Sequence, residues 1–327
     1  MKKVLLATAV AAMAFTSCSQ NEEFENAGQV EIGFNSIVKN STRAAEVDLI
    51  ELKKQGFKVY AYNTGSDLIG TGVLNKPIME NESITWNTNK WTSAKYYWPS
   101  TGNVQFFAYS SKSSLALTAS TTDKYPTLVD YTVPALASAQ EDLLIAQATD
   151  KTKVSATIDF VFSHALTQVN FSIKGEDDLK YTVSEIKLSG IGNKGTYKYE
   201  NNTWTVTGSE TYICAISATP ADNLVIGTTA KSVSSEPLML LPQKLTTAKV
   251  IVSYIVTDSN NNEVYKAIDK ESSITTTWNP GKKVRYTLEL TNDATEIGWN
   301  VTSVDEWSSD SNKEEDNDIT PVTPENL

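Results

Sequence analysis

Residue types that commonly perform catalysis or bind metal ions are scarce in this chain of 327 residues. His164 is the single histidine, so a zinc site or a Ser-His-Asp triad lacks the side chains that it needs. His164 falls on the apolar side of an alternating run, which favours a buried, hydrogen-bonded imidazole. Asp177 and Asp178 follow Gly175 in an expected turn, and no spacing marks them as a glycosidase pair. The sequence therefore predicts no enzyme, no cofactor and no metal site, with a hydrolase as the weakest hypothesis.

Two further motifs match ligand-binding patterns only in part. Gly190–Gly195 fits Gly-x-Gly-x-x-Gly, which binds a dinucleotide where a helix follows it. Here the strand-like run Thr196–Tyr199 follows, and we expect a hairpin loop. Asp258–Glu263 spaces its oxygen atoms like a calcium loop, but Glu263 stands where that loop requires glycine. We therefore expect a polar hairpin turn at this position.

One aromatic-rich segment has the composition of a surface that stacks on sugar rings. Aromatic clusters in β-sandwiches more often pack into the core and against hairpins, and we favour that interpretation. The alternative function is that of a surface glycan-binding lipoprotein acting as a monomeric β-sandwich. The segment contains Trp86, Trp91, Tyr96, Tyr97 and Trp98.

The two cysteines have different surroundings. Met1–Lys3 is basic, and Val4–Phe15 is apolar apart from one threonine; the stretch is too short to span a bilayer and predicts a signal peptide over residues 1–17. The residues before Cys18 resemble a lipobox, in which the cysteine takes diacylglyceryl before cleavage, so we expect lipid attachment at Cys18. The alternative is an ordinary secretory peptide. Cys214 stands among apolar residues, which predicts a small buried strand residue rather than a catalytic thiol.

The charge of the chain argues against two classes of partner. The formal net charge is −11 at pH 7, and removal of Lys2 and Lys3 with the signal peptide makes the mature chain more acidic. Binding to nucleic acid and polybasic contact with a membrane are both disfavoured, so attachment to a membrane would depend on the lipid. Residues 308–327 are acidic and hold few large apolar side chains, which predicts a flexible tail.

Alternating apolar and polar residues recur along most of the chain and predict antiparallel strands with one buried face. Asn279–Lys282 places proline and glycine where a type II turn requires them. Short helices are expected only at residues 47–55 and 142–148. The fold class is therefore all-β, with two β-sandwich domains at this length. The clearest strands lie at Val30–Phe34, Phe57–Ala61, Val104–Ala108, Val250–Val256 and Val284–Leu290.

The domain junction follows from the parity of the apolar residues. These residues occupy even positions from Val154 to Leu166 and odd positions from Val169 to Ile173. A shift by one residue turns the other face of a strand toward the core, which requires a bulge or a crossing between sheets near Thr167. We therefore expect an N-terminal β-sandwich over residues 44–166 and a C-terminal one over residues 167–307.

Short motifs in a fixed order run along nearly the whole chain. They are the lipobox with Cys18, Ser41–Ala45, Lys95–Pro99, Phe106–Tyr109, Asp142–Ala146, Phe162–Val169, Trp278–Lys282 and Tyr286–Leu288. In this order they resemble the fimbrillins, the type V pilins of the Bacteroidales. The resemblance implies two tandem transthyretin-like antiparallel β-sandwich domains in a structural or adhesive subunit of a cell-surface fimbria. Ser19–Glu23 also resembles the signal that sorts lipoproteins of this order to the outer cell surface.

The resemblance also implies how the subunit is processed and assembled. An Arg-specific protease would cut between Arg43 and Ala44 and release residues 18–43, the propeptide with the first strand. A strand of another subunit would then fill the groove. The residues suit this mechanism, because loss of the side chains on the first strand would expose an apolar trough beside an unpaired edge, which an incoming strand would cover. The side chains concerned are those of Val30, Ile32 and Phe34.

The expected partners follow from the same resemblance. They are other fimbrial subunits, the outer membrane through the lipid anchor before processing, and a host or bacterial surface ligand. Ile297, Trp299 and Val301 alternate as a donor strand would, whereas residues 308–327 hold few apolar side chains. Stalk, tip and anchor roles therefore all stay open.

Overall fold

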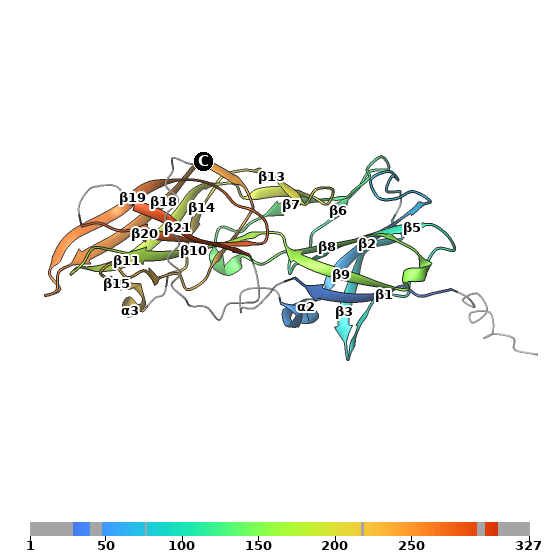
Figure 1. Ribbon diagram of the computed structural model, residues 1–327, viewed down its shortest axis with the longest axis horizontal. Helices are drawn as coiled ribbons and strands as arrows, with labels where there is room; N and C mark the ends of the chain where they lie inside the picture. Colours follow the sequence, from blue (N-terminus) through green and yellow to red (C-terminus); the bar gives the residue numbers. More distant parts are fainter. Residues whose placement is uncertain (1–28, 40–47, 76, 217–218, 293–297, 307–327) are drawn as a thin grey trace, which may run out of the picture.

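The computed structural model describes residues 29–39, 48–75, 77–216, 219–292 and 298–306, and strands dominate them (Figure 1). The prediction of an all-β fold is confirmed. The predicted helix at residues 47–55 is present as α2 (Leu49–Gln55), which the Asp48 carboxylate caps by accepting a hydrogen bond from the Glu51 amide. Single helical turns are α3 (Pro220–Asn223), η1 (Ala137–Ala139) and η2 (Lys153–Ser155). None of the described helices has the length and apolar character to cross a membrane.

A seven-stranded sheet forms one end of the elongated molecule (Figure 1). Its strands follow the order β1-β9-β8-β5-β2-β3-β4. Neighbours are antiparallel except β1 and β9, which run parallel. The strands are β1 (Gly33–Val38), β2 (Phe57–Gly65), β3 (Met79–Asn87), β4 (Lys90–Thr92), β5 (Asn103–Ser110), β8 (Leu144–Lys151) and β9 (Thr157–His164).

Two five-stranded sheets form the other end (Figure 1). One has the order β16-β10-β20-β21, with β17 also paired to β10, and the other has the order β14-β11-β18-β19, with β15 paired to β11. The first contains β10 (Thr167–Lys174), β16 (Lys231–Ser232), β17 (Leu238–Leu240), β20 (Lys282–Glu289) and β21 (Gly298–Glu306). The second contains β11 (Lys180–Ile191), β14 (Glu210–Ile213), β15 (Leu224–Ile226), β18 (Lys244–Thr257) and β19 (Glu263–Thr277).

A four-stranded sheet, in the order β13-β12-β7-β6, lies between the two ends. It takes strands from both sides of the predicted junction at residue 167, because β7 pairs with β12. The division into two transthyretin-like domains at that residue stays a prediction. The strands are β6 (Leu117–Thr118), β7 (Thr127–Thr132), β12 (Lys194–Lys198) and β13 (Thr203–Thr207).

Both faces of the seven-stranded sheet are covered at its central strands. On β2, Val59 and Ala61 belong to one apolar cluster, whereas Tyr60 and Tyr62 belong to a second and larger cluster that extends through the other sheets. Since successive side chains of a strand point to opposite faces, the two clusters lie on opposite sides of the sheet. The first cluster is called here the N-terminal core, and its aromatic members are Phe34, Phe57, Trp91, Trp98, Phe106, Phe160 and Phe162.

The two covered faces explain one wrong prediction. Residues 142–148 were expected to form a helix, but β8 begins at Leu144 within them. Leu144, Ile145 and Ala146 are all buried, because the N-terminal core covers one face of β8 and the larger cluster covers the other. A strand that is buried on both faces loses its polar alternation, and a short apolar run then reads equally well as a helix.

The crossing between sheets near Thr167 is confirmed. β9 ends at His164 in the seven-stranded sheet, and β10 begins at Thr167 in a different sheet. Ile158 is buried on an even position, and Val169 is buried on an odd one. The even-numbered run starts later than expected, because Val154 lies in η2 and is 93% exposed.

Candidate functional site

The first strand is the most unusual element of the fold. β1 forms the edge of the seven-stranded sheet and runs parallel to β9, with Gly33 opposite Thr157 and Val38 opposite Phe162 (Figure 1). Parallel neighbours are normally joined by a crossover within one chain segment. Here β1 precedes all the other strands of the sheet in the sequence, and residues 40–47, which follow it, lie outside the described residues.

The residues just before β1 pair with the opposite edge of the same sheet. The Ile32 amide donates to the Tyr96 carbonyl at 2.9 Å, and the Trp98 amide donates to the Val30 carbonyl at 2.9 Å. Tyr96 and Trp98 follow β4, the last strand in the sheet order. Residues 30–38 therefore link the two edges of the sheet and close it around the N-terminal core.

Two side chains anchor this strand in the N-terminal core. Ile32 is 3% exposed and Phe34 is 5% exposed. The Phe34 ring stacks on Phe160 with centroids 6.1 Å apart, and it meets Phe57 and Phe106 edge-on at 6.4 Å each. Burying side chains of this size contributes about 1.5–3 kcal/mol each. Loss of the strand would therefore expose an aromatic trough together with the unpaired edge of β9.

The comparisons with known proteins place the chain in a family. A family described as fimbrillin-like matches residues 42–307. The chain belongs to the fimbrillin-like family. The match begins beside Arg43 and extends through β21, so β1 lies before the matched segment. No curated protein sequence matches this fimbrillin-like chain.

One solved structure shows the same fold, and a second is less similar. A fimbrial protein from Bacteroides vulgatus superimposes with a TM-score of 0.67 at 23% sequence identity, covering 85% of this chain and 99% of that one. A protein from Bacteroides uniformis, provisionally assigned to cell adhesion, gives a TM-score of 0.48 at 16% identity and covers 86% of this chain and 98% of that one.

The sequence-predicted sites of this fimbrillin-like protein fall in different places. Val30, Ile32 and Phe34 lie together on the strand beside the N-terminal core, and Val30 is half-buried. Cys18, Arg43 and Ala44 lie outside the described residues, so lipid attachment and cleavage stay predictions. The sequence did not predict that residues 96–98 pair with residues 30–32, although Lys95–Pro99 was one of the motifs.

Two residues of the aromatic segment, Trp91 and Trp98, belong to the core. Trp91 is 7% exposed and packs against Phe57 at a centroid distance of 4.8 Å. Trp98 is 5% exposed, and its indole nitrogen donates to the Ala156 carbonyl at 3.1 Å. Lys53 covers the ring of the partly buried Trp86 at 4.1 Å. Trp91 and Trp98 are thus members of the N-terminal core, as the sequence analysis favoured, and Trp86 packs against that core.

The histidine and the second cysteine are buried, as predicted. His164 Nδ1 and Asp142 Oδ2 lie 2.7 Å apart, and both side chains are nearly inaccessible to solvent. Cys214 follows β14 directly and is 3% exposed, and burial raises the pKa of its thiol. A thiol held protonated in this way is a poor nucleophile.

The two motif-like loops have structural roles. A strand follows Gly190–Gly195, as expected, but the loop is a crossing from β11 to β12 in another sheet and not a hairpin. Asp258–Glu263 is the predicted hairpin turn between β18 and β19. The Asp258 carboxylate accepts hydrogen bonds from the side chain and amide of Asn262 and from the Asn260 amide, and these lower its pKa. Among the described residues no group of acidic, histidine or cysteine side chains has the arrangement of a metal site.

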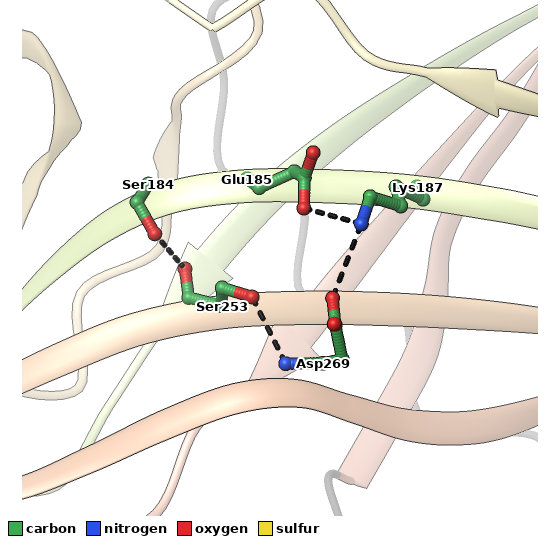
Figure 2. A network of polar contacts seen from close by, with 5 residues as sticks. All are labelled: Ser184, Glu185, Lys187, Ser253 and Asp269. Carbon is green, nitrogen blue, oxygen red and sulfur yellow. Dashed lines mark hydrogen bonds and ion pairs between the residues drawn. The ribbon is translucent and has the colours of Figure 1, made fainter.

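A polar network that the sequence did not predict lies on the outer face of the five-stranded sheet that contains β11, β18 and β19 (Figure 2). Ser184 donates to the Ser253 carbonyl at 3.0 Å, and the Asp269 amide donates to the Ser253 hydroxyl at 2.9 Å. Lys187 bridges Glu185 and Asp269, and these two carboxylates raise its pKa. The pairing shifts register on β11 between Val183 and Glu185 and on β18 between Val252 and Tyr254, so the network spans aligned bulges.

The buried pair gives a first testable prediction. Replacing Asp142 by alanine removes the hydrogen bond to the buried His164 imidazole, so we expect the free energy of unfolding to fall by about 1–3 kcal/mol. Urea denaturation followed by tryptophan fluorescence measures the change. Glu271→Ala is the control, because it removes only a surface carboxylate that is 47% exposed, where ion pairs contribute little. Equal losses in the two variants would contradict a structural role for the buried pair.

Proposed function

We propose that this fimbrillin-like protein is a subunit of a cell-surface fimbria. In this proposal it is exported as a lipoprotein on Cys18, cut between Arg43 and Ala44, and assembled when a strand of another subunit replaces β1. Its partners are then other fimbrial subunits, and its location is the outer membrane and later the fimbria. In this proposal the assembled fimbria provides adhesion to surfaces, and no catalytic group takes part.

The observation that carries the proposal is the placement of β1. An edge strand that links both edges of its sheet covers a continuous groove, which consists of the aromatic trough, the β9 edge and residues 96–98. The strand precedes Arg43 in the sequence, so one cut after Arg43 would leave it held by noncovalent contacts alone. An incoming strand would restore the backbone hydrogen bonds and the apolar burial together.

The arginine content supports Arg43 as the cleavage point. The chain contains two arginines, Arg43 and Arg285. Arg285 lies within β20, between β10 and β21, and its backbone is part of that sheet. Cleavage of a central strand requires the sheet to open first. Of the two bonds that an arginine-specific protease could cut, only the bond after Arg43 therefore lies outside the described sheets.

A sequence repeat supports a second copy of this chain as a source of the incoming strand. Residues 31–35 read Glu-Ile-Gly-Phe-Asn, and residues 296–300 read Glu-Ile-Gly-Trp-Asn. The first segment leads into β1, and the second leads into β21, an edge strand. The two segments differ at one position, where both have an aromatic residue. A strand that matches β1 so closely would place its isoleucine and its aromatic ring in the same sites of the groove.

Cleavage should lower stability, and a matching peptide should restore it. We expect protein cut after Arg43 and freed of residues 18–43 to melt at a lower temperature than intact protein, because the groove is then empty. A peptide of residues 29–38 should restore about 2.7 kcal/mol at a hundred times its Kd. Differential scanning calorimetry measures both changes.

The control peptide has the same composition with its apolar residues moved by one position. That shift turns every apolar side chain to the solvent face, so this peptide should leave the melting temperature unchanged. Equal effects of the two peptides, or no loss of stability on cleavage, would contradict strand exchange. N-terminal sequencing of the protein from cells tests processing directly, since the mature chain would start at acylated Cys18 or at Ala44.

A further inference from the structure

One position of β1 does not suit the groove that the strand fills. Every second side chain of a strand points to the same face, so the side chains of residues 32, 34, 36 and 38 point toward the N-terminal core. Ile32 and Phe34 are buried there, and Val38 packs against the same cluster. The remaining residue is Ser36, whose hydroxyl oxygen is buried and has no hydrogen-bond partner among the described residues. A buried hydroxyl without a partner weakens the packing of the strand that carries it.

The β9 residues that face Ser36 are apolar and do not require a hydroxyl. Its partner in the register is Phe160 on β9, and Phe160 and the alternate residues Ile158 and Phe162 are all fully buried. Native proteins satisfy most buried polar atoms, and exceptions are informative. An aliphatic side chain at position 36 would bury more apolar surface and would remove the unsatisfied oxygen.

The repeat supplies such a side chain. When residues 31–35 are aligned with residues 296–300, Ser36 corresponds to Val301. We propose that Ser36 makes β1 the weaker occupant of its own groove, and that the groove selects an incoming strand with an aliphatic residue at this position. A second copy of this chain carries such a residue at Val301, on the edge strand β21, and would present it once β21 leaves its pairing with β20. This inference rests on the proposed strand exchange and adds the residue that gives the exchange its direction.

The physical consequence depends on cleavage. Before the cut, β1 is tethered to the sheet, and its effective concentration is on the order of millimolar for a short linker, so a weak strand stays in place. After the cut, β1 competes as a separate peptide and loses that advantage. A strand with valine in place of serine then displaces it. Ser36 thus lets one strand protect the groove in the intact chain and leave it in the cleaved one.

The test compares peptides on isolated cleaved chains. Full-length protein is immobilised sparsely, so that neighbours cannot exchange strands, then cut after Arg43 and washed. Peptides of residues 29–39 with serine, alanine or valine at position 36 are flowed over it, and Kd is measured by surface plasmon resonance. We expect Ser36→Val to bind about tenfold more tightly, which corresponds to about 1.4 kcal/mol. Ser36→Ala should also bind more tightly, because it removes the hydroxyl without adding volume.

The matched control is Asn35→Val. Asn35 is exposed on the opposite face of β1, so added apolar surface there should not tighten binding. If the native peptide binds but neither Ser36 variant binds more tightly, the role of Ser36 is wrong and the groove itself is supported. If none of the peptides binds, the strand-exchange proposal fails and this inference fails with it. In the whole chain, Ser36→Val should raise the melting temperature and slow assembly after cleavage.

Discussion

Replacing Arg43 by alanine is expected to leave the secreted subunit monomeric. The physical reason is that β1 stays covalently tethered, so its effective concentration at the groove exceeds that of any strand from another molecule. Assembled material should fall to background in size-exclusion chromatography and negative-stain electron microscopy. The variant itself should fold normally, because residue 43 lies outside the described strands and the groove keeps its own strand.

Two further variants separate cleavage from charge. Arg43→Lys keeps the positive charge but should resist an arginine-specific protease, so it should behave like Arg43→Ala. Arg285→Lys changes the second arginine, inside β20, and should assemble like the unmodified protein. Long assemblies formed by Arg43→Ala would show that cleavage after residue 43 does not trigger assembly.

Replacing Cys18 by alanine is expected to abolish both lipid labelling and membrane fractionation. The net charge of −11 gives the chain no electrostatic attraction to an anionic membrane, and no described helix can cross a bilayer. In the proposed function the chain is held by acyl chains on Cys18, in which each buried methylene contributes about 0.8 kcal/mol. Incorporation of labelled palmitate and the membrane-bound fraction should both drop to background.

The other cysteine provides the control for this experiment. Cys214 is buried beside β14 and is held as a neutral thiol, so it should take no lipid. Cys214→Ala should therefore keep full labelling and full membrane fractionation. Lipid label that persists in Cys18→Ala and disappears in Cys214→Ala would overturn the lipoprotein proposal.

The period-two pattern was sufficient to predict the β-fold, the strand before Arg43 and the crossing near Thr167. It could not reveal the direction of β1, because a strand has the same alternation whether its neighbour runs parallel or antiparallel. It also could not identify β8, whose two buried faces remove the alternation. Sequence-distant pairing is the remaining limit, since nothing local in β7 or β12 shows that they join.

Within the candidate site, the sequence identified the anchors but not the weak position. Ile32 and Phe34 stand out because they are large and apolar. Ser36 merely interrupts the alternation, and an interruption is commonly the end of a strand. Only the pairing of β1 through Val38 shows that Ser36 lies inside the strand and faces the N-terminal core. A polar residue at a core-facing position is therefore informative once the register is known.

The long strand β19 has a consequence for the proposed assembly. It is the outer strand of its sheet in the described structure, spans 15 residues, and shifts register against β18 at three places. Bulges twist an edge away from a flat neighbour, and the aligned bulges under the Lys187 network add a bend. A straight strand from another molecule could therefore pair with only short stretches of β19. In the proposed assembly, the β9 edge thus needs a removable cover, whereas the irregular β19 edge needs none.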